Sequence, residues 1–230
     1  MKRRRKGLWA AFTLLLILVL VLAGLGLALK QEPEFYARGA VQTPQANDPD
    51  NASLAQTKLL EMQTSLETPK PSSGEWIVGL SQDELNSFLR EDPNNWNAVG
   101  PAIAPFRDPR ISFEGDTIVL AARSGNGFFS TVVWAEFRVW LIGQEPNLVA
   151  IEVVSLRAGA IPLSKSWLMD RFTKMALAKG AEVTWYRGDD KNPVGVLRLR
   201  ARLTQPDMLM TVLSVAEGQI NIGGKSLLGP

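Results

Sequence analysis

The sequence predicts an α+β protein in which an N-terminal transmembrane helix precedes a curved antiparallel β-sheet packed on one or two helices. Three observations carry this prediction. An uncharged apolar run, residues 8–29, follows a basic cluster. From Arg110 onward, apolar and polar residues alternate with period two in segments separated by turn residues, as in antiparallel strands. Only two helical patterns, starting near Ser81 and Ser164, occur among the strands. A parallel sheet needs helices that alternate with its strands, so this order argues against one.

The apolar run has the length of a membrane span. Its 22 residues, Leu8 to Leu29, would form a helix about 33 Å long, and the hydrocarbon core of a bilayer is about 30 Å thick. The alternative is a cleaved signal peptide with Gly26 and Ala28 at the cleavage site. The apolar core of a signal peptide has only about 7–15 residues. The length therefore favours a retained anchor.

The charges around this run predict its orientation. Basic residues stay on the cytoplasmic side of a membrane helix, and all five residues from Lys2 to Lys6 are basic. We therefore expect a single-pass protein of the cytoplasmic (inner) membrane, with its N-terminus inside and residues 31–230 extracytoplasmic. The predicted parts are a cytoplasmic flank (1–7), the transmembrane helix (8–29), a stalk with an amphipathic helix near 52–66 (30–74), and the α+β domain (75–230).

The composition excludes several classes of function. The first 30 residues hold six basic and no acidic side chains, so the rest of the chain has 19 basic and 23 acidic ones. The pI of 9.0 therefore comes from the anchor's flank and does not indicate a nucleic-acid partner. The chain has no histidine and no cysteine, which excludes Ser-His-Asp and Cys-His triads, disulfides and the usual zinc ligands. We expect no cofactor and no catalytic activity.

The coarse element pattern can be assigned in order. Ser81 and Glu84 match a capping box that starts a helix, and a second helix runs from Ser164 or Ser166 to about Ala178. In the longest strand, one face is expected to be core (Phe129, Val133, Ala135, Phe137, Val139 and Leu141). The opposite face is mixed (Val132, Trp134, Glu136, Arg138 and Trp140). Candidate strands are 75–80, 110–114, 117–123, 127–142, 148–158, 182–187, 194–203, 209–215 and 219–222.

Two short motifs resemble a known family. The first is Leu80-Ser81-Gln82-Asp83-Glu84-Leu85-Asn86-Ser87-Phe88-Leu89, and the second is Gly159-Ala160-Ile161-Pro162-Leu163 at the end of a strand. With the anchor and the strand order between them, the chain resembles the YpmS-like family of bacterial membrane-anchored proteins over roughly residues 75–222. That arrangement is similar to one half of the tubular lipid-binding folds, in which a curved sheet wraps a long helix. The resemblance therefore implies a lipid or other apolar ligand.

Several apolar residues are candidates for a binding groove. Trp134, Trp140 and Trp167 carry large apolar surfaces with a polar handle, and Ile161, Pro162 and Leu163 lie at a strand-to-helix corner. These six residues could line an apolar groove, or they could be ordinary core and corner residues. The shape of the space between the sheet and helix 164–178 separates the two interpretations. A groove favours ligand binding, and a filled core favours a structural module.

Charged residues provide two further candidates. Arg198, Arg200 and Arg202 alternate along one strand and could contact anionic headgroups or envelope polymers, or simply form a solvated face. Glu136 and Glu152 could act as a hydrolytic carboxylate pair, or form cross-strand ion pairs with nearby arginines.

The leading hypothesis is a non-catalytic binding protein for a lipid or other apolar envelope component, with the membrane lipid bilayer and a lipid ligand as partners. The alternative is a structural or interaction module that docks a membrane or envelope protein. A hydrolase using the two glutamates is the third.

Overall fold

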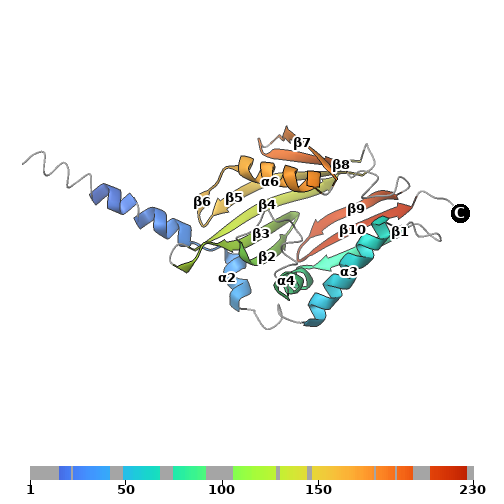
Figure 1. Cartoon of the computed structure of the whole chain (residues 1–230), viewed down its shortest axis with the longest axis horizontal. Coiled ribbons are helices and arrows are strands. Elements are labelled where there is room, and N and C mark those ends of the chain that lie inside the picture. The colour runs from blue at the N-terminus through green and yellow to red at the C-terminus, as the bar shows by residue number, and fades with distance from the viewer. Residues whose placement is uncertain are drawn as a thin grey trace, which may run out of the picture.

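The computed structural model confirms the α+β class and divides the strands between two antiparallel sheets (Figure 1). The strands predicted from the sequence are present at nearly the predicted positions. The predicted strand 194–203 is described only as far as residue 198. The structure describes residues 16–21, 23–41, 49–67, 75–91, 106–127, 130–143, 147–178, 180–189, 191–198 and 208–226.

The larger sheet contains seven strands within the described residues. Their order is β2-β3-β4-β5-β8-β7, and the short β6 pairs with β5 beside this path. A bulge between Glu136 and Phe137 shifts the pairing of β4 with β5, so that Phe137 lies opposite Val153. The strands are β2 (Arg107–Glu114), β3 (Thr117–Ser124), β4 (Thr131–Leu141), β5 (Leu148–Ala158), β6 (Ile161–Pro162), β7 (Glu182–Arg187) and β8 (Pro193–Arg198).

The smaller sheet joins the two ends of the predicted domain. β1 (Glu75–Ser81) pairs with β10 (Gln219–Ser226), which pairs with β9 (Met208–Ala216). Helices α3 (Pro49–Glu67) and α4 (Gln82–Glu91) pack on this sheet. The amphipathic helix predicted near 52–66 is therefore confirmed as α3. The apolar cluster that holds the layer together consists of Trp76, Val78 and Leu80, with Leu59, Met62, Leu85, Ile220 and Ile222 around them.

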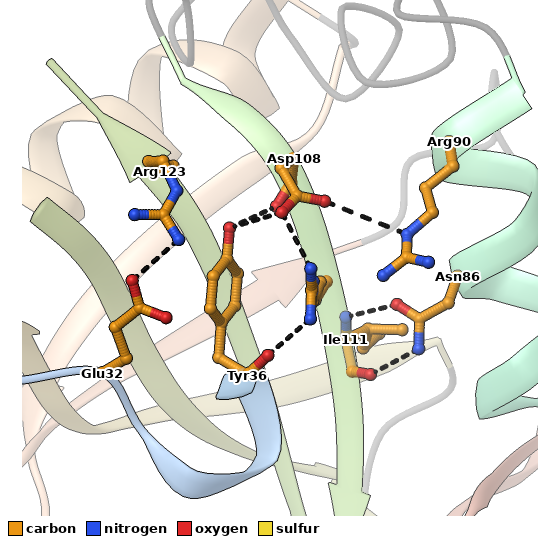
Figure 2. Close-up of polar contacts among 8 residues, drawn as sticks. Glu32, Tyr36, Asn86, Arg90, Asp108, Ile111 and Arg123 are labelled. Carbon is orange, nitrogen blue, oxygen red and sulfur yellow. Dashed lines mark hydrogen bonds and ion pairs between the residues drawn. The ribbon is translucent and has the colours of Figure 1, made fainter. Parts of the chain in front are cut away.

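Helix α4 also covers the outer edge of β2. An edge strand presents free N–H and C=O groups that can pair with other chains. The side-chain amide of Asn86 accepts from Ile111 N at 2.8 Å and donates to Ile111 O at 2.9 Å (Figure 2). Gln82 Oε1 accepts from Phe113 N at 3.1 Å. The first family-like motif thus supplies the two side-chain amides that bond the free backbone groups of Ile111 and Phe113 at this edge.

The start of α4 has the predicted capping box. Glu84 N donates to Ser81 Oγ at 3.2 Å, and Ser81 N donates to Glu84 Oε2 at 2.9 Å. The other carboxylate oxygen of Glu84 accepts from Lys58 Nζ at 2.6 Å. This ion pair joins α3 to α4.

The two faces of the larger sheet are covered by different helices. Helix α6 (Lys165–Ala178) lies over the face that carries Val133 and Phe137. Tyr36, from α2 (Glu34–Val41), packs against Val132 on the opposite face. Tyr36 and Val132 are 0% and 1% exposed, whereas Val133 and Phe137 are only half-buried. Ala135, on the predicted core face, is also buried, at 6%, so both faces of β4 contribute to the packing. The cover that Tyr36 gives the opposite face was not predicted, because Tyr36 lies far earlier in the chain, beyond the reach of local periodicity. Phe129 lies outside the described residues.

The described parts of the predicted stalk belong to the folded body. Tyr36, Ala52 and Ala55 are buried, and α3 packs on the smaller sheet. Residues 30–41 and 49–67 therefore do not form a free-standing stalk, because a few apolar side chains in this mostly polar segment are enough to dock it. Residues 42–48 and 68–74 lie outside the described residues.

An N-terminal helix, residues 16–21 and 23–30, projects away from both sheets (Figure 1). Before Ala28 its described apolar side chains are exposed: Leu20 is 62% exposed and Leu27 is 71% exposed. Across the described residues, the structure contains no helix that combines the length and the apolar character needed to cross a membrane. Residues 8–15 and 22 of the predicted span lie outside them, as does the predicted flank 1–7. The transmembrane helix stays a prediction.

Candidate functional site

An apolar cavity of about 120 Å³ lies between α6 and the larger sheet. Apart from Arg171, the described side chains around it are apolar. The sheet contributes Leu120, Ala122, Val133, Ala135, Phe137 and Leu156, and α6 contributes Trp167, Leu168, Arg171, Phe172 and Met175. Phe106, Ala121 and Trp134 complete the lining.

Helix α6 is attached to the sheet at two places. At its start, Lys165 Nζ donates to Val154 O at 2.6 Å and to Asn192 Oδ1 at 2.7 Å. Near its middle, Thr173 Oγ1 accepts from Trp185 Nε1 of β7 at 2.8 Å. These contacts, to β5, to β7 and to Asn192 between β7 and β8, place the helix over that part of the sheet.

The space beneath the helix stays open because short side chains face it. Ala122 and Ala135 project from β3 and β4 toward α6, where a larger residue would be needed for close packing. Within α6, all of whose residues are described, only Ala176 is buried. The helix is thus bonded to the sheet at these two places but does not pack closely against it above the cavity.

Two of the six residues predicted for an apolar groove line this cavity. They are Trp134 of β4 and Trp167 of α6, and Trp167 is 43% exposed. Trp140 lies toward the other end of β4 and is 40% exposed, away from the cavity. Ile161, Pro162 and Leu163 also lie outside it, at the corner before α6. The sequence did not identify the remaining lining, because the same period-two pattern describes a filled core and a cavity wall.

The predicted corner, Gly159–Leu163, receives the end of the N-terminal helix. Ala160 N donates to Ala28 O at 2.8 Å, and Thr131 Oγ1 donates to Leu29 O at 2.6 Å. The last carbonyls of a helix lack partners within it, so these two donors cap the helix. The second family-like motif, Gly159–Leu163, is therefore the place where the end of the N-terminal helix docks on the domain.

Gly159 is required for this contact in two ways. Its φ of +57° is a conformation that favours glycine, and a Cβ there would lie 2.7 Å from Leu29 O. Trp134 Nε1 donates to Gly159 O at 3.1 Å, which holds the turn from the other side.

A second connection holds α2 on the sheet through a polar cluster around Tyr36 (Figure 2). Tyr36 Oη donates to Asp108 O at 2.9 Å and to Asp108 Oδ2 at 3.0 Å. Arg110 donates to Tyr36 O and, at 2.9 Å, to Asp108 Oδ2, and its guanidinium lies 4.3 Å from the centre of the Tyr36 ring. Burial, reinforced by the Asp108 charge and hydrogen bond, raises the pKa of Tyr36 well above its usual value.

Two more arginines extend this cluster. Arg123 donates to Glu32 Oε1 at 2.7 Å, and Arg90 Nε lies 3.9 Å from Asp108 Oδ1. Glu32 lies just before α2, so the ion pair fastens the chain directly after the N-terminal helix. Since every member contacts another part of the chain, the cluster has a structural role: it holds α2 and α4 on the larger sheet.

Glu152 is not available for acid-base chemistry with Glu136. Asn192 Nδ2 donates to Glu152 Oε1 at 2.7 Å, and Arg138 lies 3.5 Å from Glu152 Oε2. Arg138 is also the register partner of Glu152, so the cross-strand ion pair considered from the sequence is confirmed. Across the described residues, no group of acidic side chains could hold a metal ion.

Of the predicted basic stripe, only Arg198 lies within the described residues. It is exposed at the end of β8, where its register partner on β7 is Glu182. Arg200 and Arg202 lie outside the described residues, so an anionic contact stays a prediction.

No protein-family model, curated protein or solved structure matches the chain.

Proposed function

We propose that the protein is a membrane-anchored, extracytoplasmic binding protein that takes up part of a lipid acyl chain, or another apolar envelope component, without catalysis. The apolar cavity between α6 and the larger sheet carries this proposal. Apolar pockets with few polar groups are the usual form of small-ligand sites. Among the described residues of the lining, Arg171 is the one that is charged, and its exposed guanidinium could pair with an anionic headgroup outside the cavity.

The volume sets the size of the ligand and the strength of its binding. A cavity of 150 Å³ in another protein holds one benzene molecule, so about 120 Å³ admits roughly five methylene groups. At about 0.8 kcal/mol for each buried methylene, the gain is about 4 kcal/mol, which corresponds to millimolar affinity. Such binding is weak in free solution. It becomes useful when an anchor holds the cavity beside a bilayer, where acyl chains have a high effective concentration.

Two sequence observations support the same function. The predicted anchor places the domain at a membrane, and the resemblance to the YpmS-like family and to tubular lipid-binding folds implies an apolar ligand. The chain also lacks histidine and cysteine, so the commonest catalytic groups are missing.

Photocrosslinking of a lipid tests the proposal. The full chain is placed in vesicles containing a phospholipid with a diazirine in its acyl chain, irradiated, digested and analysed by mass spectrometry. Crosslinks are expected on cavity residues of both layers, such as Leu120, Leu156 and Met175. The variant Ala135→Leu fills the cavity from its floor and should remove most of these crosslinks.

The matched control is Ala178→Leu, the same change at an exposed position at the end of α6. It should leave the crosslinks unchanged. Equal crosslinking of the wild type and Ala135→Leu, or crosslinks confined to the N-terminal helix, would refute acyl-chain binding in this cavity.

The docking alternative depends on Trp140, which is 40% exposed and lies outside the cavity. Exposed aromatic residues are enriched in protein interfaces. If a membrane-protein partner binds there, Trp140→Ala should abolish crosslinking in cells to a discrete protein while leaving the lipid crosslinks intact.

A further inference from the structure

The N-terminal helix is joined to the larger sheet at a single defined corner. Its last carbonyls, Ala28 O and Leu29 O, accept from Ala160 N and Thr131 Oγ1. Glu32 and Tyr36 then fasten the chain that follows. The direction in which the helix leaves the domain is therefore set by hydrogen bonds on both sides of Lys30.

Exposed apolar side chains lie around the same corner. Leu163 is 40% exposed and Trp167 is 43% exposed, and Pro162 between β5 and α6 is exposed as well. Only two residues, Ile161 and Pro162, separate the Gly159–Ala160 turn from Leu163, and Trp167 lies in the first turn of α6. In Figure 1 the N-terminal helix meets the sheet at the end where β6 lies and α6 begins. Trp167 and Arg171 are the exposed residues among the described lining of the cavity, so the cavity has its most accessible wall at the start of α6.

We infer that this corner, comprising Pro162, Leu163 and Trp167, rests in the interface of the lipid bilayer and that the cavity fills from the bilayer at this point. The inference rests on the proposed function, because it takes the apolar run 8–29 as a membrane span. The predicted span ends at Leu29, and the carbonyl of Leu29 is bonded to the sheet. The bilayer boundary then falls within about one helical turn, roughly 5 Å, of the Ala160 turn.

The residue types at the corner fit that position. Indole rings are enriched at the level of the lipid headgroups, where one edge is apolar and the other is wet. Arg171 stacks over Trp167, with its guanidinium 5.5 Å from the ring, and presents a positive charge beside the apolar surface. The occupant of this surface is therefore the bilayer that holds the anchor.

The absence of cysteine makes the inference directly testable. Leu163→Cys and Leu177→Cys each introduce one thiol for an environment-sensitive fluorophore. Leu177 is the matched control, because it is 69% exposed and lies near the opposite end of α6. Both leucines are exposed, so replacing them leaves the fold intact. The full chain is reconstituted in phosphatidylcholine vesicles with and without nitroxide-labelled lipids.

The label at Leu163 is expected to shift to the blue and to lose emission when nitroxide lipids are present, while the label at Leu177 responds only to aqueous iodide. Iodide quenching of both labels alike would overturn the inference. A blue shift at Leu163 without lipid quenching would also overturn it and would indicate that the label is buried against this chain or a second copy of it. Lipid crosslinks inside the cavity together with an aqueous Leu163 would leave the proposed function standing and remove only the membrane contact.

Discussion

Replacing Gly159 by alanine is expected to release the N-terminal helix from the domain. The new Cβ would overlap the carbonyl oxygen of Ala28 and lie 2.7 Å from that of Leu29. Both atoms belong to backbone, so a side-chain rotation cannot relieve the contact. The helix end has to move, and the hydrogen bonds that Ala160 N and Thr131 Oγ1 donate to it are lost.

The cost of this change has two parts that can be separated. The φ of +57° costs an alanine about 1–2 kcal/mol. Each of the two lost hydrogen bonds contributes about 0.5–1.5 kcal/mol, so undocking adds about 1–3 kcal/mol. Gly115 supplies the control, because its φ is +60° and nothing lies within 4 Å of an added Cβ. Gly115→Ala should carry the conformational cost alone.

Hydrogen exchange of the full chain measures the undocking part. The amide of Ala160 is protected by Ala28 O, and an opening easier by about 1–3 kcal/mol lowers its protection roughly 5- to 150-fold. The amide of Leu163 is an internal reference, because it donates to Leu156 O within the sheet at 2.8 Å and should keep its protection. Unchanged protection of Ala160 in Gly159→Ala, or an equal loss in Gly115→Ala, would refute the docking of the helix at this corner.

Two further predictions concern the contacts that hold the layers together. Asn86→Ala removes both bonds to Ile111 at the edge of β2 and should cost about 1–3 kcal/mol by urea unfolding in detergent micelles. The exposed Asn126→Ala should cost almost nothing, and equal midpoints for the two variants would contradict the edge role. In a Tyr186→Phe background Tyr36 is the sole tyrosine, and no tyrosinate absorbance should develop before the protein unfolds. Because folding raises the pKa of Tyr36, its contribution is complete below about pH 10 and is lost above it, so the unfolding free energy should fall there, and less steeply in Tyr36→Phe. An equal fall with Phe at position 36 would assign the alkaline loss to other groups.

The sequence predicts most of the elements because each has a local signal. The capping box at Ser81 and Glu84 starts α4, and turns such as Gly115-Asp116 separate β2 from β3. The strand ladder from β2 to β5 follows from period two, since consecutive antiparallel strands joined by short turns pair with each other. These features depend on neighbouring residues only.

The features that the sequence did not predict all depend on contacts between distant segments. β1 pairs with β10 from the other end of the chain, and Asn86 binds the backbone of Ile111. Tyr36, in a segment that reads as polar, becomes the most deeply buried aromatic of the described residues. The glycine of the Gly159–Leu163 motif indicated a turn, but only the structure places the end of another helix against it.

The cavity itself argues for a ligand over a purely structural module. Volume left empty inside a core costs about 24 cal/mol per Å³, so about 120 Å³ costs at most about 3 kcal/mol of stability, since this cavity is partly open. A structural module that docks a partner through the surface around Trp140 has no use for the cavity, so the lost stability would serve no function there. A leucine in place of Ala135 would recover part of it, because the added side chain enters space that is already open. Ala135→Leu is therefore expected to raise the unfolding free energy, by at most about 3 kcal/mol, while it lowers lipid crosslinking. A lower unfolding free energy for Ala135→Leu would contradict this reasoning, because it would show that the added side chain does not enter open space, and a loss of crosslinks in that variant would then reflect destabilisation.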